Sequence, residues 1–151
     1  MKKKTISIIG GAGRAGLPLS LILASKNLKT IIIDVDLKKL NKLKEGIMPF
    51  KEFGSDEILK KFKKKITFTN NYNYLKKSDI IILTTETPVD THFNPEIKKV
   101  EKVIDRIIPY LHNNQTLILR STLYPGTSQM IDSYLRKKNL KINLSFCPER
   151  I

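Results

Sequence analysis

The sequence predicts one α/β domain over residues 1–151, a doubly wound, Rossmann-like parallel sheet with helices on both faces. Three observations predict it. Short apolar runs rich in β-branched residues alternate with helical patterns along the whole chain. A glycine-rich turn follows the first run, and the length of 151 residues suits a single core.

Six short runs predict the strands, at residues 5–9, 30–33, 66–69, 80–83, 116–119 and 142–146. The run at 80–83 is apolar throughout, as in a strand covered on both faces. Helical spacing between the runs predicts helices around residues 17–23, 37–43, 58–62, 97–108 and 126–138, and a brief one at Leu75. Ser55 is the expected N-cap of the third helix, and Pro95 suits the first turn of the fourth. This alternation predicts right-handed crossovers between parallel strands.

A GxGxxG motif, Gly11-Ala12-Gly13-Arg14-Ala15-Gly16, lies between the first strand and the first helix. Gly11 permits a tight turn, and Gly13 lets a pyrophosphate approach the backbone amides. Gly16 allows the helix to pack closely on the strand. The helix N-terminus then faces the phosphate charge, so the motif predicts a dinucleotide site.

The second strand ends at Asp34, where a carboxylate accepts hydrogen bonds from the adenosine ribose hydroxyls. A 2′-phosphate would be repelled there, which favours NAD over NADP. Arg14 and Lys39 complicate the choice, because nearby basic residues partly tolerate a phosphate. The alternative is a structural glycine turn beside a surface aspartate.

Polar residues follow three further strands, at 84–88, 120–122 and 147–150. Ligands of doubly wound sheets bind beyond the carboxyl ends of the strands, so these loops are expected to converge on one site. Each loop also has a plain explanation, such as hydroxyls that cap turns or a surface ion pair.

The formal charge of +14 raises the question of nucleic-acid binding. Most of the basic residues are scattered lysines, whereas base recognition favours arginine, so no nucleic-acid partner is expected. One cysteine makes no intramolecular disulfide, and glycines and Arg14 interrupt the apolar start of the chain. We therefore expect a cytoplasmic protein without a membrane partner.

Cys147, His92 and His112 show no catalytic triad and no metal-ligand spacing, so no metal is expected. A nucleophilic cysteine needs a base or a positive partner, and only Arg150 lies near Cys147 in sequence. The favoured interpretation of Cys147 is a small apolar residue near the edge of the sheet.

Six strings occur in order along the chain: IGGAGRAGLPLS, DVD, GIMPF, TPVDTHFNP, LRSTLYPGTS and FCPERI. In that order they resemble the NAD-binding domain of the UDP-glucose/GDP-mannose dehydrogenase family over the whole chain. The TPVD loop and the CPER ending are more similar to the UDP-N-acetylhexosamine branch, including UDP-N-acetylmannosamine dehydrogenases. The resemblance implies oxidation of a UDP-sugar C6 alcohol to a carboxylate with two NAD, a reaction of polysaccharide biosynthesis.

The resemblance also implies roles for individual residues. The positions matching NAD-binding residues of the family are Arg14, Ala15, Asp34, Lys39, Thr87 and Thr122. The resemblance also implies that Thr122 takes part in the water network at the reacting carbon. It implies that Glu149 acts as a general base that polarises water for thioester hydrolysis. Arg150 and Ile151 match positions that touch the nucleotide sugar in the hexosamine branch.

In the family, the nucleophilic cysteine lies in a glycine-rich motif further downstream, followed by a second domain that holds the UDP. A long central helix forms a homodimer. By resemblance, the 151 residues are therefore expected to be a fragment that is inactive alone. The main alternative is a non-catalytic nucleotide-binding or regulatory module derived from that domain. A hydroxy-acid dehydrogenase explains neither TPVDTHFNP nor CPERI.

Overall fold

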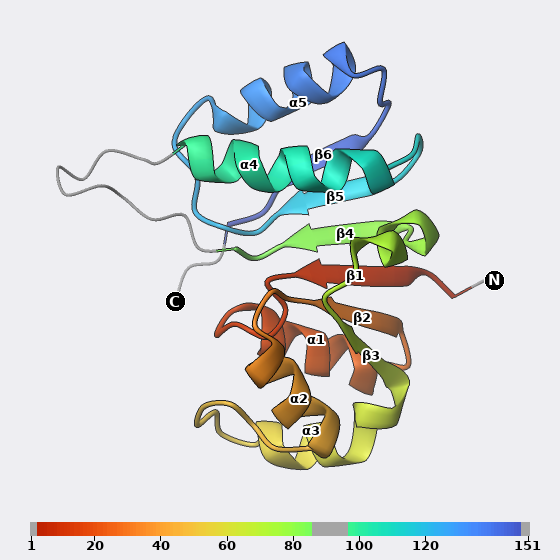
Figure 1. The fold of residues 1–151 in the computed structure, drawn as a ribbon, viewed down its shortest axis with the longest axis vertical. Coiled ribbons are helices and arrows are strands. Elements are labelled where there is room, and N and C mark those ends of the chain that lie inside the picture. The colour runs from red at the N-terminus through yellow and green to blue at the C-terminus, as the bar shows by residue number, and fades with distance from the viewer. Residues whose placement is uncertain (1–2, 86–96, 149–151) are drawn as a thin grey trace, which may run out of the picture.

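The structure, a computed structural model, describes residues 3–85 and 97–148. Its centre is a six-stranded parallel sheet in the order β3-β2-β1-β4-β5-β6 (Figure 1). The strands are β1 (Thr5–Ile9), β2 (Lys29–Ile33), β3 (Ile66–Thr69), β4 (Ile80–Leu83), β5 (Thr116–Leu119) and β6 (Asn143–Phe146). The order reverses between β1 and β4, the point at which doubly wound folds bind ligands. The predicted Rossmann-like fold is confirmed.

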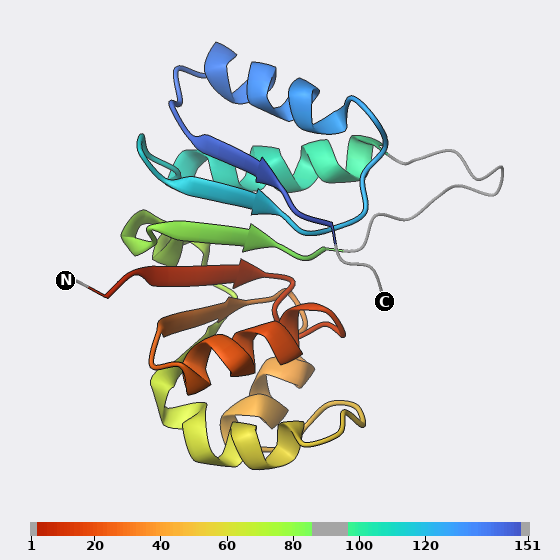
Figure 2. The same ribbon diagram turned by 180° about the vertical axis from the view of Figure 1, so that it is seen from behind.

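Helices surround both halves of the sheet. The α-helices are α1 (Gly16–Ser25), α2 (Leu37–Glu45), α3 (Ser55–Phe62), α4 (Ile97–Ile107) and α5 (Thr127–Lys137). Short 3₁₀ turns are η1 (Lys63–Lys65), η2 (Tyr72–Lys77) and η3 (Ile108–Tyr110). Helices α1 to α3 gather around β3, β2 and β1, whereas α4 and α5 lie beside β4, β5 and β6 (Figures 1 and 2).

The core divides between the two faces of the sheet, as the alternation of side chains along a strand requires. On one face Ile32 is fully buried with Leu17 and Leu21 of α1, Leu43 of α2 and Leu59 of α3. The other face packs β-strand side chains against α4 and α5. Its central members are Ile33, Ile81, Leu83, Ile104, Ile107, Leu117, Ile131 and Leu135. Two helix layers therefore enclose the strands.

The strands end level with one another. Ile9 pairs with Ile33 on one side and with Leu83 on the other. Leu83 pairs with Leu119, and Leu119 with Phe146. Because all pairs are parallel, the residues that follow these strands emerge together at what we call the carboxyl end of the sheet.

Most predicted elements are confirmed, with small shifts at their ends: β2 begins one residue earlier than expected, and β6 one residue later. The predicted cap at Ser55 is wrong. Gly54 takes the N-cap position with φ +73°, and Ser55 is the buried first residue of α3. Leu75 lies in a 3₁₀ turn, and Pro95 lies outside the described residues.

Candidate functional site

The glycine loop joins β1 to α1 at the switch point of the sheet. Its left-handed residue is Gly10, with φ +77°, a position just before the GxGxxG motif. The amide of Gly10 donates to the carbonyl of Ile33 at 2.9 Å, and that of Gly11 to the same oxygen at 3.4 Å. These bonds fix the loop to the end of β2.

The motif glycines lie where an added side chain would clash with neighbouring atoms of the protein. A Cβ on Gly16 would lie 2.5 Å from the carbonyl oxygen of Gly10 and 2.7 Å from Oγ1 of Thr84. The predicted close packing of helix on strand is thus confirmed. A Cβ on Gly11 would lie 2.9 Å from the Ile8 carbonyl oxygen, and one on Gly13 3.1 Å from that of Gly10. The loop can fold this tightly against the end of the sheet only because these side chains are absent.

Helix α1 starts directly after this loop, and the Leu17 amide donates to the Gly13 carbonyl at 3.0 Å. No acidic residue occupies its first turn. The N–H groups at a helix start have no intrahelical acceptor, so this end of α1 suits a phosphate. Exposed Arg14 stands beside it, with its guanidinium carbon 5.6 Å from the centre of the Phe50 ring. The loop after α2 therefore contacts the glycine loop.

Asp34 lies half-buried at the end of β2, held by two backbone amides. Its Oδ2 accepts a hydrogen bond from the Ala12 amide at 3.0 Å, and its Oδ1 accepts one from the Asp36 amide at 3.0 Å. A carboxylate has about four acceptor positions, so both oxygens keep capacity for ribose hydroxyls. The fixed orientation fits the predicted ribose contact.

Lys39 is occupied by a neighbouring carboxylate. Asp36 caps α2 by accepting the Lys39 amide at 3.0 Å, and its Oδ2 lies 3.6 Å from the Lys39 ammonium. The hydrogen bond from the Lys39 backbone amide is the main cause that lowers the pKa of the Asp36 carboxyl. Desolvation opposes this shift in part, and the charge of the Lys39 ammonium adds to it. The Lys39 ammonium is thus paired with the Asp36 carboxylate, so it would attract a 2′-phosphate less strongly. Sequence reasoning missed this cap, although an aspartate three residues before Lys39 is its usual signal.

The ends of β4 and β5 complete this side of the sheet. The amide and the Oγ1 of Thr84 both donate to the Ile9 carbonyl at 2.9 Å. Ser121 donates its hydroxyl to the Thr85 carbonyl at 2.5 Å, and Thr122 beside it is exposed. The predicted convergence is confirmed for residues 84–85 and 120–122. Thr84 belongs to the loop 84–88 that the sequence predicts at this site, but its hydrogen bond to the Ile9 carbonyl could not be read from the sequence.

Cys147 follows the edge strand β6, near the edge of the sheet as predicted, but its side chain is exposed. The expectation of an apolar packing residue is therefore wrong. Its amide donates to the Leu119 carbonyl at 2.9 Å, and Arg120 Nη1 lies 3.7 Å from its sulfur. A strand at the edge of a sheet has a neighbour on one side only, which leaves its last residues open to solvent.

Four predicted site residues, Thr87, Glu149, Arg150 and Ile151, lie outside the described residues. Within residues 3–85 and 97–148, no cluster of three His, Cys, Asp or Glu side chains is arranged to hold a metal ion. In the same ranges no helix combines the length and apolar character needed to cross a membrane.

The described residues fit a dinucleotide. Close backbone approach at Gly13, a helix start without acidic side chains and a carboxylate fixed at the end of the second strand occur together. They lie at the switch point of the sheet. This is the combination required to hold a pyrophosphate and an adenosine ribose.

Known proteins resemble this chain in sequence. The chain is 33% identical to a UDP-N-acetyl-D-mannosamine dehydrogenase of Methanocaldococcus jannaschii, over 98% of this chain and 35% of that protein. It is 30% identical to a UDP-glucose 6-dehydrogenase of Rickettsia conorii, over 92% of this chain and 33% of that one. The chain thus spans about a third of the length of the curated relatives it matches.

Solved structures agree on the fold. A UDP-D-ManNAc dehydrogenase from Pyrococcus horikoshii superposes with a TM-score of 0.89 at 24% identity, over 97% of this chain and 36% of that one. An NDP-N-acetyl-D-galactosaminuronic acid dehydrogenase from Methanosarcina mazei superposes with a TM-score of 0.87 at 26% identity, over 99% of this chain and 35% of that one. Residues 4–151 match the description "UDP-glucose/GDP-mannose dehydrogenase family, NAD binding domain". The chain belongs to this family, and the glycine loop and Asp34 lie in its NAD-binding domain.

Proposed function

We propose that this domain serves an NAD-dependent enzyme that oxidises the C6 alcohol of a UDP-sugar to a carboxylate. The reaction removes two hydrides, which two NAD molecules accept, while water supplies the second carboxylate oxygen and three protons are released. The chain's own contribution is to bind and orient the dinucleotide. The observation that carries the proposal is Asp34, held by the Ala12 and Asp36 amides beside the glycine loop.

The preference for NAD follows from the charges around the ribose position. Asp34 would repel a 2′-phosphate, and Asp36 contributes a second negative charge two residues later. Lys39 is engaged by Asp36 at 3.6 Å. Arg14 remains exposed and packs on Phe50, a position better suited to the pyrophosphate than to the ribose.

The proposed sugar is a UDP-N-acetylhexosamine. The TPVDTHFNP and CPERI strings support this choice, as do relatives named UDP-N-acetyl-D-mannosamine dehydrogenase and UDP-N-acetyl-D-glucosamine 6-dehydrogenase. A relative named UDP-glucose 6-dehydrogenase matches at similar identity, so the sugar requires a direct test.

The remaining residues receive roles consistent with their place in the sequence. Thr87 and Thr122 contact the cofactor, and Thr122 also orders water near the reacting carbon. Glu149 acts as the general base that activates water, and Arg150 and Ile151 touch the nucleotide sugar. The exposed position of Thr122, three residues after β5, supports its access to a ligand at the switch point.

We further propose that the 151-residue chain binds NAD weakly and does not turn over, and that the full-length protein is a cytoplasmic homodimer. The nucleophilic cysteine and the UDP-holding domain would lie beyond residue 151. Steady NADH formation by the purified chain from any UDP-sugar would contradict its predicted inactivity.

Calorimetric titration tests the substrate separately from the cofactor. The NAD-saturated chain is titrated with UDP-N-acetylglucosamine, UDP-N-acetylmannosamine and UDP-glucose. We expect weak binding of the N-acetylated sugars and weaker binding of UDP-glucose. Equal or tighter binding of UDP-glucose would overturn the proposed sugar and leave the NAD site standing.

A further inference from the structure

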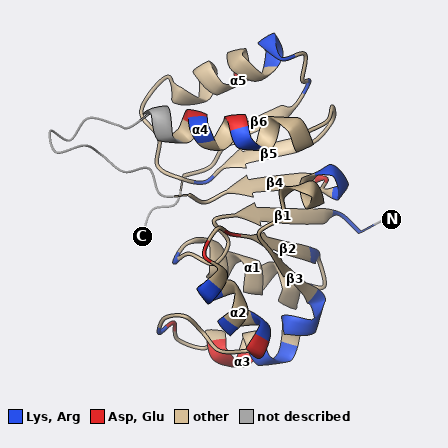
Figure 3. Cartoon of the chain, viewed as in Figure 1, with Lys and Arg blue, Asp and Glu red and all other residues tan. Residues whose placement is uncertain are grey.

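Positive charge is concentrated at the amino end of the sheet, where the strands begin. Five of the six strands are preceded or started by lysines, and Figure 3 shows these blue segments along the side of the molecule where the strands start. We call the twelve residues the strand-entry lysines: Lys3, Lys4, Lys26, Lys29, Lys63, Lys64, Lys65, Lys76, Lys77, Lys137, Lys138 and Lys141. All except Lys63 are exposed.

Little negative charge balances them. Within the segments that carry the strand-entry lysines, the single carboxylate before a strand is Asp79. That carboxylate accepts the Thr5 amide at 2.7 Å and lies 3.9 Å from the Lys4 ammonium. Two further lysines donate hydrogen bonds to uncharged oxygens: Lys63 to the Glu45 carbonyl and Lys65 to the Asn27 side chain. Most of the charge therefore faces solvent.

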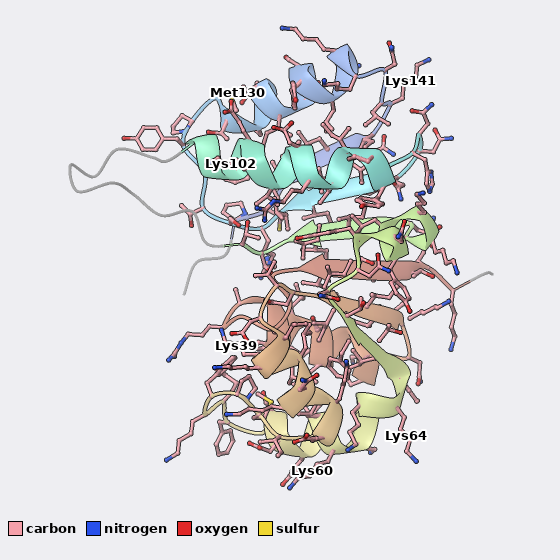
Figure 4. All side chains as sticks on the ribbon, in the orientation of Figure 1. Lys39, Lys60, Lys64, Lys102, Met130 and Lys141 are labelled. Carbon is pink, nitrogen blue, oxygen red and sulfur yellow. The ribbon has the colours of Figure 1, made fainter. Side chains whose placement is uncertain are left out.

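The opposite end of the sheet is mixed in charge. Within the described residues, the loops after the strands and the first turn of α2 carry Arg14, Lys38, Lys39 and Arg120, together with Asp34 and Asp36. Figure 4 shows the contrast: Lys64 and Lys141 extend on the side where the strands begin, and Lys39 extends on the other side. The asymmetry is thus a property of the fold and not of composition alone.

Helix dipoles explain only part of this arrangement. The described α-helices all end toward the amino end of the sheet, and lysines in a last turn stabilise the negative pole of a helix. Each pole amounts to about half an elementary charge, so five helices supply about −2.5 charges. The strand-entry lysines exceed this several-fold, and Lys3, Lys4, Lys29 and Lys141 lie outside any helix.

We propose that the amino end of the sheet is a docking surface for an anionic lipid bilayer. The six strand starts extend over about 24 Å, and helix ends on both faces widen the row into a plane. Lysines at such a surface are attracted by acidic headgroups without penetrating the bilayer. The sequence predicts no membrane partner. That no helix within residues 3–85 and 97–148 could cross a membrane does not bear on a surface contact.

The chemistry of the surface favours lipid over nucleic acid. Lysines outnumber arginines at this end: Arg106 and Arg136 lie in the last turns of α4 and α5, and Arg136 is paired with Asp132 at 2.7 Å. Phosphate forks and base edges favour arginine. Two aromatic rings among them have ammonium groups nearby: Lys61 and Lys65 lie 5.5 and 5.3 Å from the centre of the Phe62 ring. Lys76 lies 5.8 Å from that of Tyr110. These rings are not open to stack on bases, as single-strand binders require.

The orientation is compatible with the proposed function and independent of it. A bilayer at the amino end leaves the glycine loop and Asp34, at the carboxyl end, facing water. Soluble cofactor and nucleotide sugar would reach the site freely, and docking neither requires nor blocks NAD.

The test is co-sedimentation with vesicles of equal parts phosphatidylglycerol and phosphatidylcholine, compared with pure phosphatidylcholine. The variant K29Q/K64Q/K77Q removes three exposed strand-entry lysines that have no hydrogen bond or ion pair within the described residues. The control K38Q/K51Q/K102Q removes three exposed lysines elsewhere, so both proteins have the same net charge. Thermal melting verifies that both are folded.

We expect binding to the acidic vesicles only. Each lysine near an acidic surface contributes about fivefold, so the strand-entry variant should lose about 100-fold in partition coefficient and the control less than about threefold. Equal losses in the two variants would overturn the proposal, as would no binding of the original chain at low salt. Tighter binding to duplex DNA, lost selectively in K29Q/K64Q/K77Q, would also overturn it in favour of nucleic acid.

Discussion

The carboxylate of Asp34 accepts the amide of Ala12 at 3.0 Å, which joins the end of β2 to the glycine loop across the switch point. One group therefore sets the position of the loop and of the proposed ribose contact together. A change at Asp34 should therefore affect both NAD binding and the local order of the loop.

Replacement of Asp34 by asparagine is expected to weaken NAD binding. The variant loses a charged acceptor, and a hydrogen bond to a charged group contributes about 1.5–3 kcal/mol, or roughly 10- to 100-fold in Kd. Isothermal calorimetry with NAD and NADP measures the effect, and the preference for NAD should shrink. The exposed Asp56→Asn on α3 is the matched control. Unchanged affinity in D34N would rule out the ribose contact.

Gly16→Ala is expected to destabilise the domain through a steric clash. The new Cβ would lie 2.5 Å from the Gly10 carbonyl, so the backbone must shift at a cost of about 3 kcal/mol. Gly54→Ala provides the comparison, because Gly54 has φ +73° with no atom within 4 Å of its Cβ position. We expect Gly54→Ala to lower the free energy of unfolding by about 1 kcal/mol. Urea unfolding measures both, and equal costs would show that packing at Gly16 is not tight.

Thr84→Val is expected to cost about 1 kcal/mol in the free energy of unfolding. The change keeps the shape but removes the hydroxyl that donates to the Ile9 carbonyl at 2.9 Å. Thr67→Val on β3 is the control, since no hydrogen bond from its hydroxyl is found among the described residues. A loss in T84V no larger than in T67V would mean that the hydroxyl does not hold β1 and β4 together.

Asp36 should make stability depend on pH in acid. Its pKa lies below the ordinary value of 3.8, so the folded state favours the carboxylate. The resulting stability is present above 3.8 and is lost as the pH falls through the lower folded value. Melting temperatures of the original chain and Asp36→Asn should therefore differ at neutral pH and converge at the acid end. A constant difference at all pH values would contradict this assignment.

Sequence patterns were sufficient for the strands and for the ligand-binding end of the sheet. The apolar runs of β1, β2 and β4 are buried along most of their length, as expected of inner strands of a parallel sheet, and Gly16 has the tight packing expected of the third motif glycine. The GxGxxG pattern could not show that Gly10, outside the motif, takes the left-handed conformation. That assignment depends on the direction in which the chain leaves β1 toward Ile33.

Other errors arose where tertiary geometry overrides local preference. Ser55 follows a glycine whose positive φ already turns the chain into α3, so its hydroxyl has no capping position. Cys147 resembles a packing residue by type, yet it follows a strand at the edge of the sheet and is exposed. The contact between Arg14 and Phe50 joins segments far apart in sequence, which no local pattern reveals.

The most direct test of the central claim is calorimetric titration of the purified chain with NAD and with NADP. We expect saturable binding of NAD, and binding of NADP at least about tenfold weaker because Asp34 repels the 2′-phosphate. Absence of NAD binding, or tighter binding of NADP, would contradict the central claim.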